Sequence, residues 1–162
     1  MEIIEETNEE QEKVIKSDIN EQIMVNAPPG TGKTYTVSKK IEYIVENKIV
    51  SLKEVLIICF SRSALKEIKN RIKISEEQKK ELTIRTIDSF CSWIIKEIEE
   101  ENYKNIFNET TFDSRIEYVI KLLKTNENLQ KSIKNMKHII IDEVQDIVRN
   151  KGKICFRIIK II

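Results

Sequence analysis

The glycines and prolines of this chain are concentrated in one short stretch. The 162 residues include only three glycines and two prolines, and four of these five residues lie between Pro28 and Gly32. The stretch reads Ala27-Pro28-Pro29-Gly30-Thr31-Gly32-Lys33-Thr34 and matches the pattern G-x-x-x-x-G-K-[ST], with alanine in the first position. Glycines in such a loop let backbone N–H groups approach a phosphate, and the lysine can reach the outer phosphates. The pattern predicts a phosphate-binding loop, and a chance Gly/Pro turn before a helix is the alternative.

The elements expected around this loop are a strand and a helix. Residues 22–26 read as a short buried strand, and apolar residues recur at helical spacing between 37 and 45. A loop in this position faces the unpaired N–H groups and the positive end of the helix dipole. We therefore expect Lys33 to contact phosphate and the hydroxyl of Thr34 to ligate Mg2+.

A second candidate group is a pair of acids at the end of an apolar strand. Residues 138–141 read as that strand, and Asp142 and Glu143 follow it directly. Ligands bind at the carboxyl ends of strands in open α/β sheets, so this pair and the phosphate loop are expected at one edge. Asp142 would hold Mg2+, usually through water, and Glu143 would polarise the attacking water. Alone, two such acids would be read as a solvated strand end.

Composition argues against several classes of site. With a formal net charge of +1, the chain would bind nucleic acid through a local patch rather than through bulk charge. One histidine and three cysteines without a C-x-x-C pair argue against a zinc site, a disulfide framework and histidine-based catalysis. Cys59, Cys91 and Cys155 are expected to be core residues in a reducing cytoplasm. No apolar run is long enough for a signal peptide or a membrane span.

The remaining pattern predicts an α/β fold. Thr7-Asn8-Glu9-Glu10 fits a capping box at the start of a helix. Residues 55–60 form the continuous apolar run of a strand buried on both faces, and residues 82–86 read as a weaker strand. A helical pattern follows each strand, which predicts a mostly parallel sheet flanked by helices.

Two further helices are expected in the highly charged segment 97–137. Their apolar stripes lie at helical spacing, and the residues are Ile116, Val119, Ile120 and Leu123 in one and Leu129, Ile133 and Met136 in the other. The aromatic residues of the segment are expected in the core rather than on a base-stacking surface; they are Tyr103, Phe107, Phe112 and Tyr118.

Five segments, in order along the chain, resemble the UvrD/Rep/PcrA-like superfamily 1 DNA helicases, including the RecB/AddA branch. They are TNEEQEKVI, APPGTGKT, VLIICFSRSALKEIKNRI, TIRTIDSFC and HIIIDEVQD. These are similar to the Q motif, motif I, motif Ia, the T-x-H-S-F segment and motif II of that family, and they cover nearly the whole chain. The resemblance implies a RecA-like P-loop NTPase lobe that binds ATP and Mg2+ and acts on single-stranded DNA.

The resemblance also implies roles for single residues. Gln11 would read the adenine, and Gln145 would link the nucleotide site to the DNA track. The whole loop from Ala27 to Thr34 would contact the nucleotide, and the catalytic residues would be Lys33, Asp142 and Glu143. Residues after two of the strands would contact single-stranded DNA: Phe60, Ser61, Arg62, Thr86, Ser89 and Phe90. Asp88 departs from the family pattern, since histidine is commonest in its place.

The same resemblance predicts a domain organisation. Residues 1–146 would form an N-terminal ATP-binding lobe, with the helical insertion of many relatives reduced to residues 97–137. Only 51 residues separate Phe90 from Asp142. The chain stops 16 residues after Asp146, before the family's G-D-x-x-Q segment. The expectation is therefore a fragment or a truncated reading frame that lacks the C-terminal motor lobe.

Residues 147–162 form an atypical tail. It contains no acid, and its basic residues are Arg149, Lys151, Lys153, Arg157 and Lys160. In the implied fold, the strand after motif II lies between residues 22–26 and residues 139–141. We expect residues 154–162 either to form a short helix that leaves this place open or to enter the sheet as a substitute strand.

These observations favour one function over two alternatives. The favoured function is the ATP-binding lobe of a DNA helicase that translocates 3′ to 5′ on single-stranded DNA and is inactive as an isolated fragment. The alternatives are a small ATP-binding regulatory module, as in a toxin-antitoxin pair, and a non-functional truncated remnant. The location expected in every case is cytoplasmic, without membrane contact.

Overall fold

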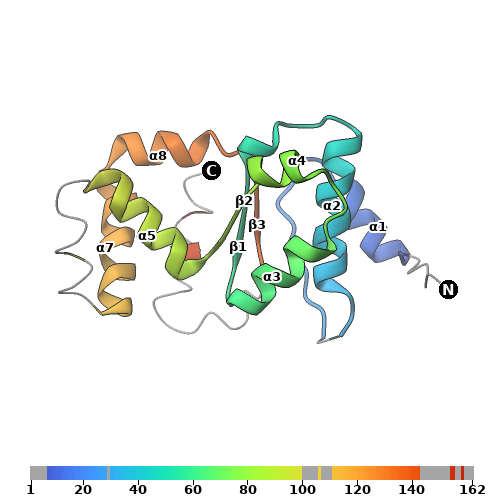
Figure 1. Ribbon diagram of the computed structural model, residues 1–162, viewed down its shortest axis with the longest axis horizontal. Helices are drawn as coiled ribbons and strands as arrows, with labels where there is room; N and C mark the ends of the chain where they lie inside the picture. The colour runs from blue at the N-terminus through green and yellow to red at the C-terminus, as the bar shows by residue number, and fades with distance from the viewer. Residues whose placement is uncertain are drawn as a thin grey trace.

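A three-stranded parallel sheet stands between two groups of helices (Figure 1). The computed structural model describes residues 7–28, 30–99, 106, 111–142, 154, 155 and 158. The strand β1 (Val55–Cys59) pairs in parallel with β2 (Thr83–Thr86) on one side and with β3 (His138–Ile141) on the other. This arrangement confirms the α/β class and three of the strands expected from the sequence.

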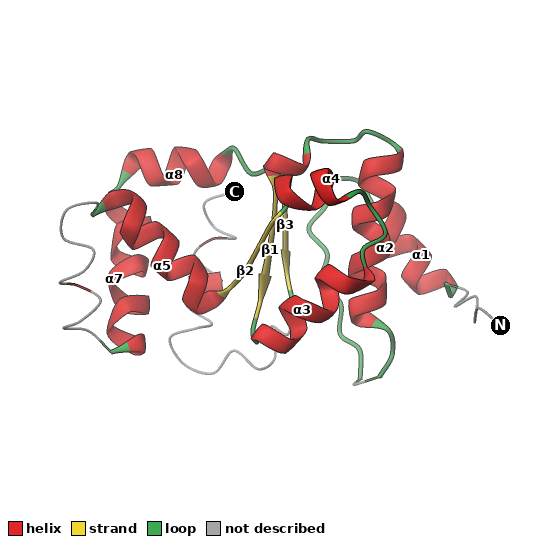
Figure 2. Cartoon of the chain, viewed as in Figure 1, coloured by secondary structure: helices red, strands yellow, loops and turns green. Residues whose placement is uncertain are grey.

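The helices cover both faces of this sheet (Figure 2). Those in the N-terminal half are α1 (Glu9–Lys16), α2 (Lys33–Glu46), the 3-10 turn η1 (Leu52–Glu54), α3 (Arg62–Arg71) and α4 (Glu76–Glu81). Those in the other group are α5 (Ile87–Ile98), α7 (Phe112–Thr125) and α8 (Glu127–Lys134). The short helix α4 was not predicted from the sequence. Among the described residues, no helix is long and apolar enough to cross a membrane.

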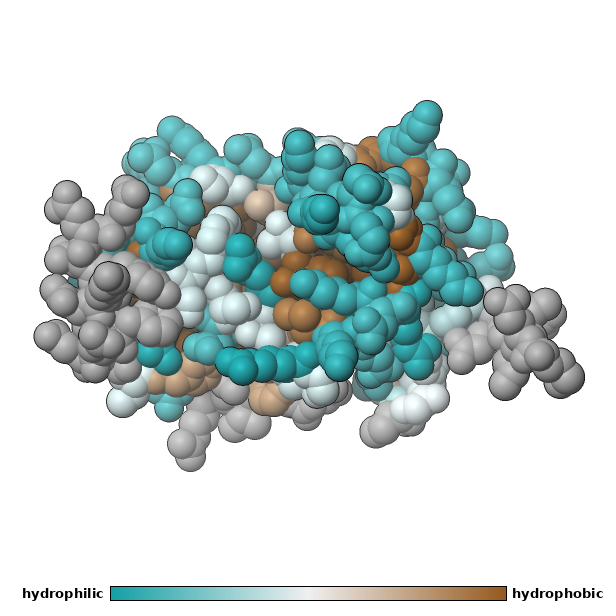
Figure 3. All heavy atoms as spheres, viewed as in Figure 1, coloured by the Kyte–Doolittle hydropathy of each residue, from teal (hydrophilic) through white to brown (hydrophobic). Residues whose placement is uncertain are grey.

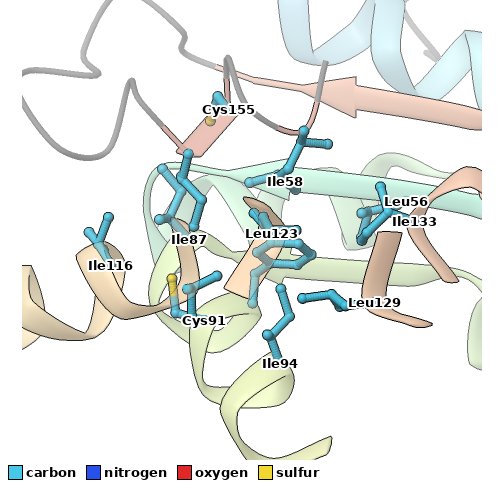
Figure 4. Packing of buried hydrophobic residues seen from close by; sticks show 14 of the residues in the cluster. Leu56, Ile58, Ile87, Cys91, Ile94, Ile116, Leu123, Leu129, Ile133 and Cys155 are labelled. Atoms are coloured by element: carbon cyan, nitrogen blue, oxygen red, sulfur yellow. The ribbon is translucent and has the colours of Figure 1, made fainter. Parts of the chain in front are cut away.

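The central strand is buried along its whole length because each face packs on a different set of helices. Leu56 and Ile58 point into a cluster formed with α5, α7 and α8 (Figure 4). Val55 and Ile57 point into a second cluster formed with α2 and α3. Side chains alternate between the two faces of a strand, so a continuous apolar run is what a strand covered on both sides requires.

Several helices begin at an N-cap residue whose side chain accepts a hydrogen bond from a backbone N–H of the first turn. The capping box of α1 is formed by Asn8 and Gln11, one residue later than the Thr7–Glu10 box predicted from the sequence. Thr86 and Ser89 form the capping box of α5, directly after the last residue of β2. A side-chain cap of this kind typically contributes about 1 kcal/mol and fixes where the helix starts.

The segment expected to hold two helices does hold them, as α7 and α8. Their apolar stripes face the cluster around Ile58, and Ile116, Val119 and Leu123 of α7 are fully buried there. Phe112 and Tyr118 pack partly buried against the same cluster, which confirms the core interpretation for these two aromatics. Tyr103 and Phe107 lie outside the described residues.

The strand predicted for residues 22–26 is absent, and this expectation was wrong. The segment has no regular secondary structure, and Ile23, Met24 and Val25 are 43%, 91% and 49% exposed. A strand needs a neighbour to bond its backbone groups, and within the described residues no strand lies on the outer side of β3 to provide one. The apolar sequence alone cannot bury a segment whose N–H and C=O groups have no ladder to join.

The few described residues of the tail agree with the helical alternative. Ile154, Cys155 and Ile158 are in helical conformation and buried in the cluster around Ile58. Cys155 lies near Ile58 and Ile87 in that cluster (Figure 4). These residues therefore stabilise the α5 and α7 side of the sheet, and they do not fill the place beside β3.

Two buried polar side chains fix α2 to its surroundings. Lys40 is only 4% exposed, and its Nζ donates to the carbonyl of Ser17 at 2.6 Å and to the Ser17 hydroxyl at 3.0 Å. Glu42 is 7% exposed and accepts a hydrogen bond from the backbone N–H of Lys73 at 2.8 Å. These contacts connect α2 to the end of α1 and to the segment after α3.

We expect stability to fall as the pH drops through the ordinary histidine range. Burial, with the Lys40 charge as a second cause, lowers the pKa of His138, the only histidine of the chain. A group whose pKa is lower in the folded state binds protons preferentially in the unfolded state, so its stabilising effect is present above about pH 6.5 and is lost below it. Chemical unfolding of wild type and of His138→Phe at pH 7.5 and 5.5 tests this. The variant should lose less stability on acidification, and equal losses would contradict the assignment.

We also expect association through the exposed segment beside β3. The face shown in Figure 3 is mainly hydrophilic, with apolar residues gathered between α3 and α4. Among the described residues, the large apolar side chain with the highest exposure is Met24, at 91%. Unpaired strand edges next to apolar side chains promote pairing between copies. Met24→Lys should reduce concentration-dependent association in sedimentation velocity. Asn70→Lys adds the same charge at another exposed position and should leave association unchanged; equal effects of both variants would refute the local cause.

Candidate nucleotide-binding site

The phosphate loop takes a backbone shape that only glycine adopts easily. Gly30 and Gly32 have φ angles of 80° and 86°, in the left-handed region. Any other residue at these positions would be strained by its Cβ atom. Gly32 is also the residue before the first turn of α2, so the loop turns directly into that helix. Pro29 lies outside the described residues.

The N-terminus of α2 differs from those of α1 and α4 in its capping and its charge. No side chain caps it, and its first turn contains no acidic residue. In contrast, α1 and α4 have both a side-chain cap and acids in the first turn. The partial positive charge of the α2 terminus is therefore left for a group outside the helix, and phosphate is the group best suited to such a position.

Lys33 is held by the loop itself. Its Nζ donates to the carbonyl oxygens of Ala27 at 2.8 Å and Pro28 at 2.9 Å. The hydroxyl of Thr31 donates to the same Pro28 carbonyl at 2.8 Å. The charge thus lies inside the curve of the loop, where an incoming phosphate oxygen can replace the carbonyls as its partner. Thr34, the expected magnesium ligand, is the second residue of α2 and partly buried.

A glutamine from α1 touches this loop. The Nε2 of Gln11 donates to the carbonyl of Thr31 at 3.1 Å. A Cβ atom added to Gly32 would lie 2.8 Å from that same nitrogen and 3.9 Å from the Cβ of Tyr35. The family resemblance implies a contact of Gln11 with the adenine, and the contact with the loop backbone was not predicted from the sequence.

Asp142 lies at the carboxyl end of β3, as the sequence predicts. Its backbone N–H donates to the carbonyl of Ile58 at 2.9 Å and extends the ladder between β1 and β3 by one residue. The side chain is buried, at 8% exposure. The phosphate loop and the carboxyl ends of all three strands lie at the same, lower edge of the molecule in Figure 1. Glu143 and Gln145 are outside the described residues.

The residues with implied DNA contacts follow β1 and β2 at this edge, and several of them are engaged in capping. The hydroxyl of Ser61 accepts from the N–H of Ala64 at the start of α3, and Thr86 and Ser89 cap α5. Arg62 is exposed, and Phe60 is partly buried. Phe90 is a correction, because its side chain is 0% exposed and packs in the core beside Trp93 at a ring distance of 5.9 Å. It therefore offers no surface to DNA in this structure.

The structure also brings together charged residues that the sequence analysis did not connect. Asp88, in the first turn of α5, forms an ion pair of 3.7 Å with Arg115 of α7. Arg85 of β2 lies over the ring of Trp93 at 5.1 Å, and burial lowers its pKa. Burial, with the nearby Asp88 carboxylate as a second cause, raises the pKa of Cys91 to about 12, so this thiol is protonated and unreactive at neutral pH. The contacts Asp88–Arg115 and Arg85–Trp93 join separate elements, so the spacing of residues in the sequence could not reveal them.

Known proteins resemble this chain along most of its length. A family model described as the UvrD/REP helicase N-terminal domain matches residues 7–108. The ATP-dependent DNA helicase PcrA of Staphylococcus aureus is 30% identical over 132 residues, which are 78% of this chain and 17% of that protein. The RecBCD enzyme subunit RecB of Borreliella burgdorferi is 28% identical over 130 residues, covering 68% of this chain and 11% of RecB.

A probable DNA helicase II homolog of Mycoplasma capricolum is 25% identical over 146 residues, which are 81% of this chain and 20% of that protein. The chain thus spans a fifth or less of the length of these relatives. The matched region contains the phosphate loop, the capped start of α1 and the strands β1 and β2. Because the family model covers more than half of the sequence, this chain belongs to the UvrD/Rep helicase family and carries residues of its N-terminal domain.

Proposed function

We propose that this chain is the ATP-binding N-terminal lobe of a UvrD-like, ATP-dependent DNA helicase. The observation that carries the proposal is that two groups lie at the same edge of the sheet (Figure 1). One is the loop with left-handed Gly30 and Gly32, and the other is Asp142 after β3. This is the place where open α/β sheets bind ligands, and the two groups are the two halves that a magnesium–triphosphate site requires.

The residues of the loop fit a triphosphate. The uncapped, acid-free N-terminus of α2 supplies N–H groups, and Lys33, whose Nζ is bonded to the loop carbonyls, supplies a cation next to them. Thr34 and Asp142 are the oxygen ligands that would hold Mg2+. Magnesium, when bound, would neutralise phosphate charge and orient the terminal phosphoryl group. Glu143 would orient the attacking water, and Gln145 would link this site to bound DNA.

Single-stranded DNA is the proposed partner at the same edge. The N-termini of α3 and α5 point there behind the caps Ser61 and Thr86, and Arg62 is an exposed cation in the first of these turns. Helix N-termini and arginine side chains are common phosphate contacts in nucleic-acid complexes. Ser89 would act through the helix start that it stabilises. Translocation, with 3′ to 5′ polarity by family resemblance, would further require the C-terminal motor lobe as a partner.

The first prediction of this proposal concerns Lys33. Lys33→Ala removes a charge-assisted contact worth roughly 1.5–3 kcal/mol, so affinity for Mg-ATP should fall by about one to two decades. Titration with a fluorescent ATP analogue measures this. Lys66→Ala, which removes an exposed lysine from α3, is the matched control and should bind as wild type does. Equal affinity of wild type and Lys33→Ala would contradict the assignment of the loop.

The second prediction concerns turnover by these 162 residues as an isolated polypeptide. An arginine supplied to the transferring phosphoryl group typically contributes a factor of 10³–10⁵. By family resemblance those arginines belong to the second motor domain, whereas Arg62 and Arg71 belong to this lobe. We therefore expect very slow ATP hydrolysis and no unwinding. DNA-stimulated turnover of about 1 per second or faster, measured by phosphate release, would refute this expectation.

A further inference from the structure

The position of α1 depends on few contacts. Among the eight described residues of this helix, Ile15 is the one that is buried. A helix of this length is marginal by itself, so most of its stability comes from the element on which it packs. That element is α2, which lies beside α1 (Figure 1). One buried side chain fixes a contact point but leaves the direction of the helix open, so a second contact is needed.

Lys40 of α2 supplies that contact at the C-terminal end of α1. Its Nζ donates to the carbonyl oxygen of Ser17 at 2.6 Å and to the Ser17 hydroxyl at 3.0 Å. Ser17 is the C-cap residue of α1, and its hydroxyl donates in turn to the carbonyl of Val14 at 2.8 Å. The last carbonyls of a helix carry partial negative charge and lack partners within the helix. The ammonium group therefore closes the C-terminus of α1.

The charge of Lys40 is buried, and its compensation comes from the segment that follows α1. The side chain is 4% exposed, and burial lowers its pKa, while the carboxylates of Asp18 and Glu21 act in the opposite direction. The ring of Tyr43, three residues further along α2, lies 5.9 Å from Nζ. A buried ammonium group is costly unless it is paired and hydrogen-bonded. Moving residues 17–21 away from α2 would remove these partners, so the buried charge holds the segment in place.

We propose that Lys40 is a positioning residue for base recognition: it holds the C-terminal end of α1 on α2 and thereby sets the place of Gln11 beside the phosphate loop. Gln11 lies six positions before Ser17, about 9 Å away at 1.5 Å per residue. Lys33 begins α2, so one helix positions both the phosphate contact and the base contact. The inference rests on the proposed function and on the contact of Gln11 with adenine that the family resemblance implies.

Three variants separate this role from general stability. Lys40→Met keeps an unbranched side chain and removes the ammonium group together with both bonds to Ser17. Lys40→Arg keeps a cation that can donate to the Ser17 carbonyl. Glu42→Met is the matched control, because Glu42 is also buried, at 7% exposure, and anchors α2 to the backbone N–H of Lys73 at 2.8 Å. Both methionine variants lose a buried anchor of α2, but only Lys40→Met loses the anchor to α1.

Titration with Mg-ATP and with Mg-GTP gives the comparison, because the two ligands differ only in the base. In Lys40→Met, the ratio of the affinity for ATP to the affinity for GTP should fall about three- to tenfold, as the loss of one neutral hydrogen bond to the base predicts. The ratio should keep its wild-type value in Lys40→Arg and in Glu42→Met. An unchanged ratio in Lys40→Met, or an equal fall in Glu42→Met, would overturn the proposal.

The wild type keeps failure of this proposal distinct from failure of the proposed function. Equal affinity of wild type for ATP and GTP would overturn base positioning and leave the phosphate site standing, whereas binding of neither would overturn the proposed function itself. Amide hydrogen exchange without nucleotide tests the anchor independently. Exchange in residues 12–16 should be faster in Lys40→Met than in wild type and in Glu42→Met. Unchanged exchange there would overturn the positioning role whatever the affinities show.

Discussion

The parallel alignment of three strands is the constraint on which the rest of the structure depends. Because β1 has a parallel neighbour on each side, the chain must return to the same end of the sheet before every strand. The returning segments become helices on the two faces, and the carboxyl ends of all strands meet at one edge. Phe60, Thr86 and Asp142 are far apart in sequence, and this topology alone places them together.

The electrostatics of that edge follow from which helix starts are capped. The starts of α3 and α5 are closed by Ser61 and Thr86, while α2 begins at a glycine that offers no side chain. Leaving a helix N-terminus uncapped in water costs little free energy, because water can bind its free N–H groups. An anion beside such a terminus is stabilised by the helix dipole. The absence of a side-chain cap at Gly32 is therefore the local feature that distinguishes the start of α2 from the starts of α3 and α5.

Sequence reasoning succeeded where local chemistry determines structure. The apolar run at 55–59 and the stripe Ile116, Val119 and Leu123 have periods that admit one burial pattern, and the structure shows that pattern. The role of the loop glycines could be predicted equally well, because few residues other than glycine adopt a positive φ. The prediction of a strand at residues 22–26 failed because strand formation depends on a partner strand elsewhere in the chain. The Asp88–Arg115 ion pair and the Gln11–Thr31 hydrogen bond could not be predicted from the sequence for the same reason, because each joins two separate parts of the fold.

Two buried side chains of α2, Lys40 and Glu42, hold the helix to its neighbours and could act as a pivot for its tilting. Lys40 and Glu42 bind Ser17 and the backbone of Lys73, whereas the loop at the start of the helix is joined to α1 by the bond from Gln11 to the Thr31 carbonyl. Lys40 lies seven positions after Lys33 along the helix, which corresponds to about 10 Å at 1.5 Å per residue. A tilt of about 10° around this pivot would shift the loop by roughly 2 Å, more than half a hydrogen-bond length. A tilt of this kind would displace the loop more than it would displace the residues next to Lys40, because displacement grows with distance from the pivot.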